Sequence, residues 1–230
     1  MAIVLKGLIK GKEDLEMDSN TIIGIIGEIN FDLIRHLKKD NIFLMSKGND
    51  FSKEIVFEEM KQSFDLDDDS FQKLYQPLFE ELDLKESFCE KKIEDLSDSE
   101  IKILKYIKCF LSNKSIIIID EPFLDLDYAW KKKIVNMINN LYRNTNKTII
   151  VCSDNSNIIY LLCKKVLLVK NDEYYYGDIN QVFESKDLLR KFNINEPDIV
   201  KFVNLVHEKK VNLEYVKDIR DLIKEVYKSV

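Results

Sequence analysis

The chain has 230 residues, of which 45% are hydrophobic and 33% are charged, and its formal net charge is −6. This length suits one domain with a small attachment, and the composition is that of a helix-rich globular protein, so a disordered or fibrous chain is excluded. Positive residues are interspersed with acidic ones and form no basic block, so we expect no nucleic-acid partner.

The first half of the chain predicts short strands, a glycine-containing turn and an acidic helical region. Strands are expected at 2–8, 21–26 and 41–45, and a helix at 31–38. Helical periodicity follows at 54–64, 69–82 and 87–92. Because these segments are strongly acidic, we interpret residues from about 54 to 95 as a helical insert with a charged surface.

The second half of the chain alternates strands with helices. Ser97 is predicted to be the N-cap of a helix, with Glu100 completing a capping box. The following elements are a strand at 116–119, a helix at 128–142, a strand at 148–152, a helix at 157–163 and a hairpin of 166–169 with 173–176 around Asn171 and Asp172. This alternation predicts an α/β fold with a mainly parallel sheet flanked by helices.

The segment from Ile179 to the last residue has a helical pattern, in which Pro197 and residues 193–195 separate two or three short amphipathic helices. We therefore expect a main domain at 1–178 and a C-terminal helical extension at 179–230.

The four cysteines, Cys89, Cys109, Cys152 and Cys163, have no CxxC spacing, and both histidines lie far from them in the sequence. This pattern argues against a zinc site and a disulfide framework, and favours buried thiols in a reducing compartment. No signal peptide is evident, and the apolar runs are shorter than the roughly 20 residues of a membrane helix. We expect a cytoplasmic protein.

Two carboxylates follow the most apolar strand of the chain. Asp120 and Glu121 come directly after the β-branched run 116–119, at the sheet edge where open α/β folds bind ligands. Asp120 could hold Mg²⁺ through water, and Glu121 could activate an attacking water. Taken alone, Asp-Glu-Pro caps a helix about as often as it forms a metal site.

Gly24 and Gly27 have the glycine spacing of a phosphate-binding loop, but the residues that follow contain neither a lysine nor a hydroxyl up to Asp32. In an intact loop, backbone N–H groups and a lysine bind the phosphates, and a Ser or Thr hydroxyl ligates Mg²⁺. A simple tight turn after an apolar strand is the alternative interpretation of these two glycines.

The order and spacing of these motifs resemble those of the ATP-binding cassette (ABC) ATPases, which implies an ABC-type P-loop NTPase fold. By this resemblance Gly24 to Asp32 lies at the Walker A loop, Lys47 near the Q-loop, Leu96-Ser97-Asp98-Ser99-Glu100 at the LSGGQ signature, Asp120-Glu121 at Walker B and the catalytic glutamate, Asp127 in the D-loop and Ser153 at the switch histidine. The resemblance covers nearly the whole chain.

The C-terminal segment carries a narrower resemblance, to the extension of energy-coupling-factor ATPases, the cobalt-importer type among them. The matching segments are Gly177 to Phe183, Asp187 to Leu189, Asn195 to Pro197 and Asp221 to Ile223. In that family two ATPases sit beneath a transmembrane coupling subunit. The resemblance thus implies a second ABC ATPase subunit in a homo- or heterodimer, a transmembrane coupling subunit, and peripheral attachment to the inner face of the cell membrane.

Several positions depart from the family pattern, and the phosphate loop departs most. Asn30, Phe31 and Asp32 stand where the resemblance implies Lys and Ser or Thr. A charge-assisted lysine contact contributes roughly 1.5 to 3 kcal/mol, and a carboxylate about 4 Å from a phosphate repels it by roughly 4 kcal/mol at an effective dielectric near 20. We therefore expect ATP and Mg²⁺ binding to be weak or absent. Ser153 lacks an imidazole, and Asp98 and Ser99 replace two glycines of the signature.

Three functions are open on this basis. The first is a catalytically impaired ATP-binding subunit of an importer, which acts beside a competent ATPase. The second is an active ATPase in which Lys38, Lys39 or Lys47 replaces the missing lysine, and the third is a soluble regulatory or scaffold protein. A DNA-repair cassette is disfavoured, because the insert contains no long coiled coil. If a membrane subunit is the partner, we expect it to dock near 47–59 and the helical insert.

Overall fold

The computed structural model describes residues 3–5, 13–27, 41–48 and 51–229, and the chain divides into two compact units. The first unit contains residues 1–40 and 148–230, and the second contains residues 41–147. The helix predicted at 31–38 lies outside the described residues, as do the predicted site residues Asn30, Phe31 and Asp32.

The first unit is built around β3 (Ile22–Gly27), which is buried over residues 22 to 26. β3 pairs in parallel with β6 (Thr148–Cys152) and with β7 (Lys165–Lys170), and β8 (Glu173–Asp178) pairs antiparallel with β7. Because β3 has parallel neighbours on both sides, its sequence is a continuous apolar run instead of an alternating one.

The β7–β8 hairpin confirms its sequence prediction. Asn171 and Asp172 have φ values of 45° and 55°. Two consecutive residues with positive φ are typical of a type I′ turn, whose twist matches that of the two strands. Asn and Asp tolerate this conformation better than most residues, which explains why the turn was recognisable.

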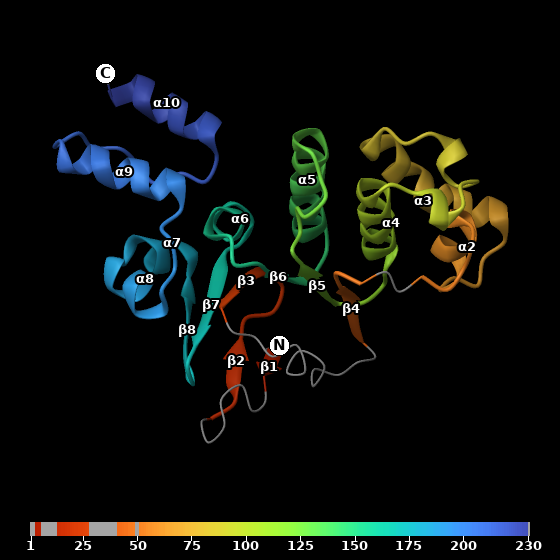
Figure 1. Ribbon diagram of the computed structural model, residues 1–230, viewed down its shortest axis with the longest axis horizontal. Helices are drawn as coiled ribbons and strands as arrows, with labels where there is room; N and C mark the ends of the chain where they lie inside the picture. Colours follow the sequence, from red (N-terminus) through yellow and green to blue (C-terminus); the bar gives the residue numbers. More distant parts are fainter. Residues whose placement is uncertain (1–2, 6–12, 28–40, 49–50, 230) are drawn as a thin grey trace. The chain divides into compact units, whose positions relative to one another are not determined.

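Helices cover the sheet of the first unit (Figure 1). α6 (Ser156–Leu162) packs on β3, α7 (Ile179–Glu184) packs on β7 and β8, and α8 (Lys186–Phe192) packs on β7. α9 (Asp198–Glu208) and α10 (Ile219–Ser229) follow, and they share a small apolar core.

The second unit contains a parallel strand pair and four α-helices in its described residues. β4 (Ile42–Met45) pairs in parallel with β5 (Ile116–Asp120), and α4 (Asp98–Leu111) packs on β4. The other helices are α2 (Val56–Lys61), α3 (Asp68–Leu82) and α5 (Tyr128–Asn144). Short 3₁₀ turns lie at Glu86–Phe88 and Ile93–Asp95.

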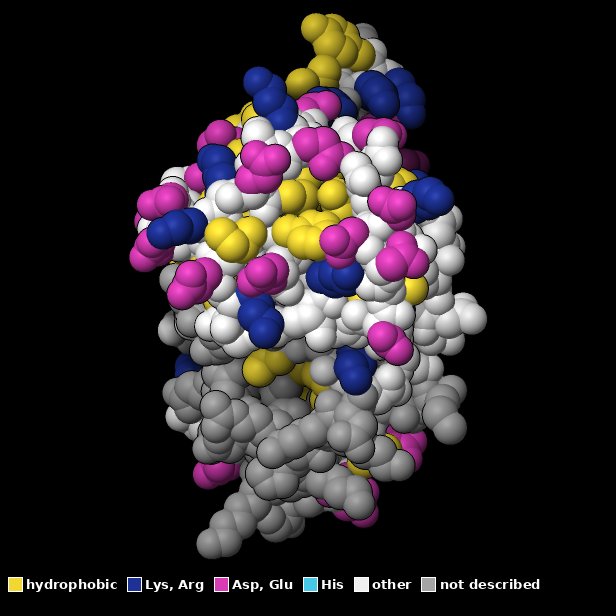
Figure 2. Space-filling view, turned by 90° about the vertical axis from the view of Figure 1, so that its right-hand side faces the viewer, with side chains coloured by type: hydrophobic (Ala, Val, Ile, Leu, Met, Phe, Trp, Pro, Cys, Tyr) yellow, Lys and Arg dark blue, Asp and Glu magenta, His cyan; other side chains and the backbone are white. Residues whose placement is uncertain are grey.

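An aromatic cluster holds the helical insert together. The rings of Phe57, Phe71, Tyr75 and Phe79 contact in series, with centroid separations of 4.8 to 5.7 Å. The surface of the insert is acidic, because residues 54–95 contain 14 Asp and Glu but only 5 Lys, a net charge of −9. Figure 2 shows the side on which α2 and α3 lie, where Asp and Glu side chains surround an apolar area.

Three element predictions need correction. The helix predicted at 87–92 is only a 3₁₀ turn at Glu86–Phe88, because the carbonyls of Cys89 and Lys91 accept hydrogen bonds from the start of α2 instead of from a following turn of helix. β2 (Leu15–Met17) was not predicted, and it pairs antiparallel with β1 (Ile3–Leu5). The C-terminal segment forms four described helices instead of two or three, because Ser185 ends α7 and caps α8.

The predicted fold class, α/β with a mainly parallel sheet flanked by helices, is confirmed within both units. In the described part of the chain, none of the helices has the length and apolar character needed to cross a membrane.

Candidate functional site

Gly24 lies inside β3, where packing alone requires a glycine. A Cβ atom at this position would lie 2.4 Å from Ile159 Cγ2 and 3.1 Å from Cys163 Sγ, both on the side of α6. Its absence lets α6 lie directly on the strand. The predicted nucleotide-binding role of Gly24 stays a prediction.

Gly27 ends β3 in a conformation that other residues rarely adopt. Its φ is 106°, and a Cβ atom would lie 2.0 Å from the carbonyl oxygen of Val169. The Gly27 N–H donates to Asp154 Oδ1 at 3.4 Å. A carboxylate of the chain itself therefore accepts from a backbone amide of the predicted phosphate loop.

Ser153 lies in the turn between β6 and α6, directly before Asp154. Its side chain is buried, its N–H donates to the Ile25 carbonyl at 3.2 Å, and its Oγ accepts from the Asn155 N–H at 3.2 Å. Asn155 in turn caps α6 by accepting from the Asn157 N–H. Ser153, at the predicted switch position, thus contributes to a backbone-stabilising turn.

In the second unit Asp120 ends β5 with its side chain only 10% exposed. Burial raises the pKa of the Asp120 carboxyl above its usual 3.8, while Lys47 opposes the shift and Glu121 adds to it. Lys47 Nζ lies 3.9 Å from Asp120 Oδ1, and the Lys47 side chain is 55% exposed. The structure therefore brings together two of the predicted site residues, Lys47 and Asp120.

A buried lysine that sequence reasoning missed holds the turn after β5. Lys102 of α4 donates from Nζ to the carbonyls of Asp120 at 3.3 Å and Glu121 at 2.7 Å. Burial lowers its pKa to about 8. One turn further along α4, the Tyr106 hydroxyl donates to the Pro122 carbonyl at 2.7 Å. The one feature of the sequence that could have indicated this role is the position of the lysine beside the apolar residues of the helix.

Glu121 has a φ of 46°, a conformation uncommon for residues other than glycine. Lys102 of α4 donates to the carbonyls of Asp120 and Glu121, which belong to the peptide groups on the two sides of this position. Such strain persists only where surrounding contacts over-determine it, and it is common at functional sites.

The predicted signature residues begin α4. Ser97 accepts from the Glu100 N–H, and the Glu100 carboxylate accepts from the Ser97 N–H, so the predicted capping box is confirmed. Lys91 pairs with Glu100 at 2.5 Å. Leu96 is buried before the cap, and Asp98 is the first residue of the helix.

The predicted D-loop lies against this helix start. Ser99 Oγ donates to the Asp125 carbonyl at 2.6 Å. Asp127 caps α5 by accepting from the Trp130 N–H at 2.9 Å. Ser99 and the 125–127 segment are thus neighbours, whereas the dimer-contact role expected of Leu96 to Glu100 and Asp127 stays a prediction.

Two further lysines of α4 attach the segment after β4. Lys105 donates to the carbonyls of Ser46, Lys47 and Gly48 at 2.6 to 3.4 Å. Lys108 pairs with Glu59, which is fully buried and also accepts from the Ser52 and Lys53 N–H groups at 2.9 and 3.0 Å.

The described residues match a magnesium–nucleotide site only in part. Gly27 donates to a carboxylate where an intact loop directs its amides at phosphate. Lys47 Nζ lies 3.9 Å from Asp120 Oδ1, so a lysine of the chain already lies beside the carboxylate that is predicted to hold Mg²⁺ through water. Within the described ranges, no three His, Cys, Asp or Glu side chains gather closely enough to hold a metal ion.

Comparisons with known proteins identify relatives of the chain. No family model matches it. An ABC transporter ATP-binding protein of Pyrococcus abyssi is 28% identical over 181 residues, which are 76% of this chain and 66% of that protein, slightly less than two thirds of its length. The energy-coupling factor transporter ATP-binding protein EcfA3 of Oenococcus oeni is 23% identical over 208 residues, 85% of this chain and 70% of that protein.

Among solved structures, CbiO1 of Clostridium perfringens, part of the ABC transporter complex CbiONQ, is similar with a TM-score of 0.64 and 18% identity. The similarity covers 86% of this chain and 92% of that chain. We therefore identify the chain as a relative of the ABC transporter ATP-binding proteins, energy-coupling-factor ATPases among them, with the ABC-type P-loop NTPase fold.

Proposed function

We propose that the chain is an ATP-binding subunit of an ABC transporter of the energy-coupling-factor type, with poor or no ATP binding at its own Walker A position. It acts beside a competent ATPase and a transmembrane coupling subunit in nutrient import. The named relatives support this role: one is an energy-coupling-factor ATP-binding protein, and the structural neighbour is part of an ABC transporter complex.

The observation that carries the impairment is the contact between Gly27 and Asp154. The Gly27 N–H already donates to the Asp154 carboxylate. Phosphate would have to displace this carboxylate and then bind beside it, with unfavourable charge repulsion. The sequence after Gly27 offers Asp32 where the family resemblance implies a hydroxyl, which adds to the repulsion.

Calorimetry tests the proposal directly. The purified chain titrated with Mg-ATP to millimolar concentration should give no binding heat, and Asp120→Asn should give the same flat titration. One-to-one binding by the unaltered chain, abolished in Asp120→Asn, would refute the proposed impairment.

An active ATPase is the second candidate, and the position of Lys47 favours it. The Lys47 side chain is largely exposed, and its Nζ lies 3.9 Å from Asp120 Oδ1. A positive charge is therefore present beside the carboxylate at the end of β5. If Lys47 replaces the missing lysine, Mg-ATP turnover should be measurable, and both Lys47→Met and Glu121→Gln should abolish it. Absence of turnover in the unaltered chain excludes this candidate.

We propose that the coupling subunit docks on a hollow of about 570 Å³ in the second unit. Its lining combines apolar and charged side chains: Phe51, Lys53, Glu54, Lys92, Ile93, Glu94 and Ile101. The insert beside it has a net charge of −9, and cytoplasmic loops of membrane proteins carry an excess of Lys and Arg. Charge complementarity therefore supports this assignment.

Co-purification with the membrane subunit tests the docking surface. The double variant Glu54→Lys/Glu94→Lys should lose the partner at low salt, whereas Asp187→Lys/Glu208→Lys, an exposed pair in the first unit, should retain it. Equal retention by both variants would contradict the assignment.

A further inference from the structure

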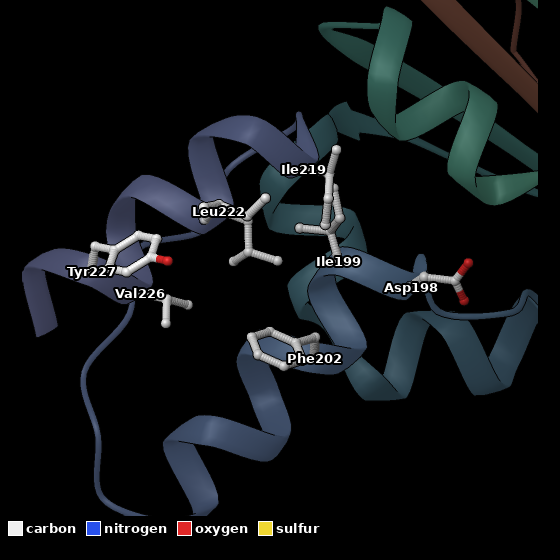
Figure 3. Close-up of a pocket in the computed structure, with 8 residues that line it drawn as sticks. Asp198, Ile199, Phe202, Ile219, Leu222, Val226 and Tyr227 are labelled. Carbon is white, nitrogen blue, oxygen red and sulfur yellow. The ribbon is translucent and has the colours of Figure 1, made fainter. Parts of the chain in front are cut away.

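α9 and α10 form a small unit with their own core. Val203, Leu213 and Leu222 are buried together, and apolar side chains of the two helices line the hollow between them (Figure 3). The Tyr215 hydroxyl donates to Asn204, which in turn donates to Glu196, so the segments before each helix are attached to α9. We treat α9, α10 and the segments before them as one structural unit, the C-terminal helix pair.

The first attachment of this helix pair to the rest of the first unit is at the start of α6. Asn157 Nδ2 donates to Asp198 Oδ2 at 2.9 Å, and the Asp198 N–H donates to Asn157 Oδ1 at 2.7 Å. Figure 3 shows the Asp198 carboxylate pointing away from the apolar residues between α9 and α10. The apolar side of α9 thus packs on α10, and its first residue is hydrogen-bonded to α6.

The second attachment is at the end of α6. Lys217, in the segment between α9 and α10, donates to the Cys163 carbonyl and lies 5.7 Å from the centre of the Tyr160 ring. A cation at the last carbonyls of a helix is favourable, because these carbonyls have no partner within the helix. α6 is therefore held at both ends by the C-terminal helix pair.

α6 begins directly after the turn at residues 153–155. That turn is bound to β3 through the Ser153 N–H, which donates to Ile25, and through Asp154, which accepts from Gly27. A polar hollow of about 680 Å³ lies between this turn and the start of α9, lined by Asp154 and Asn155 on one side and by Glu196 and Asp198 on the other.

We propose that Asp198 and Lys217 are positioning residues: through α6 they hold the turn at 153–155 against the end of β3, so that displacement of the C-terminal helix pair releases the contact between Asp154 and Gly27. The inference rests on the proposed function and deepens it: the C-terminal helix pair regulates the contact at Gly27, in the predicted phosphate loop, from within the same chain. It rests on contacts within the first unit, and its test needs no nucleotide.

Hydrogen exchange of single backbone amides tests the proposal in a charge-swap series. Asn157→Asp places two carboxylates opposite each other, so the Gly27, Ser153 and Asn155 amides should exchange about five-fold faster, equivalent to about 1 kcal/mol of local stability. Asn157→Asp/Asp198→Asn keeps the wild-type net charge and restores the side-chain hydrogen bond with donor and acceptor exchanged, while the backbone N–H of residue 198 still donates to the side chain of residue 157, so exchange should return to the wild-type rate. Asp198→Asn alone retains an amide pair and should have little effect.

Two further variants separate positioning from a general loss of stability. Lys217→Met should accelerate the same amides. Glu208→Ala should not, because it removes an exposed carboxylate of α9 that lies 3.7 Å from Lys186 of α8 and, among the described residues, contacts neither α6 nor the turn. The proposal is overturned if Asn157→Asp accelerates only amides of α9, or if the charge swap does not restore the turn. A chain that binds ATP would refute the proposed impairment without changing this result, so the two failures are distinguishable.

Discussion

Gly24 and Gly27 are three residues apart and are required for different physical reasons. At Gly24 the neighbouring atoms belong to side chains of α6, whereas at Gly27 the backbone conformation and the Val169 carbonyl both exclude a side chain. A glycine pattern alone cannot separate these reasons, because both produce the same letter in the sequence.

We predict that Gly24→Ala destabilises the protein by about 1 to 3 kcal/mol, because the added methyl overpacks the contact between β3 and α6. Urea denaturation measures the change. Gly177→Ala is a suitable control, since the nearest atoms to its Cβ all belong to the adaptable side chain of Tyr175. Equal stability of Gly24→Ala and wild type would show that α6 does not lie this close to the strand.

The buried Glu59 should make stability depend on pH. Burial opposes ionisation of Glu59, but the Lys108 side chain and the Ser52 and Lys53 amides outweigh it and lower its pKa below the usual 4.5. An acid with a lowered folded-state pKa stabilises the fold above its unfolded-state pKa and loses this contribution as the pH falls through the folded-state value. Stability should therefore decline below about pH 4.5.

Glu59→Gln removes this titration, so its free energy of unfolding should fall less steeply than that of wild type below about pH 4.5. Chemical denaturation at a series of pH values measures both curves. Parallel curves for the two proteins would mean that Glu59 is not held in its charged form.

At the scale of elements, α4 organises the second unit. Three lysines spaced three residues apart, Lys102, Lys105 and Lys108, reach the turn after β5, the segment after β4 and the buried carboxylate of Glu59. The sequence predicted the capped start of this helix. It did not indicate that these lysines would be drawn inward, because their acceptors lie far away in the sequence.

The start of α4 gives a prediction for one cap. Ser97→Ala should lower the free energy of unfolding by about 0.5 to 2 kcal/mol, because it removes the acceptor for the Glu100 N–H. Ser87→Ala, at an exposed position, is the matched control and should change stability by less than about 0.5 kcal/mol. If both variants unfold at the same urea concentration, the capping box does not stabilise the helix.

At the scale of the whole molecule, nucleotide binding should be restored by changing residues 27–32 if the lack of Lys, Ser and Thr there alone prevents it. We predict that replacing residues 27–32 with an intact glycine-rich loop carrying Lys and Thr strengthens Mg-ATP binding by about three orders of magnitude or more. Calorimetry compares this graft with the same graft carrying Ala for its lysine. A folded graft that binds no nucleotide would show that other positions also prevent binding.

The sequence alone predicted most strands and helices of the described residues, the β7–β8 turn and the Ser97–Glu100 cap, because each depends on residues within a few positions of one another. It did not predict β2. It also supported the resemblance to ABC ATPases, which the comparisons confirm. Its prediction of a helix at 87–92 was wrong, because the backbone there pairs with the start of α2.

Only the tertiary structure decided which side chains meet across long separations in the chain. Lys102 reaches the carbonyl of Glu121, Asp154 reaches the amide of Gly27, and Asp198 reaches Asn157. The sequence near each of these residues does not indicate its partner, because Lys, Asp and Asn are common on protein surfaces without such contacts. Packing of distant segments brings them within hydrogen-bonding distance, and that packing depends on the whole core.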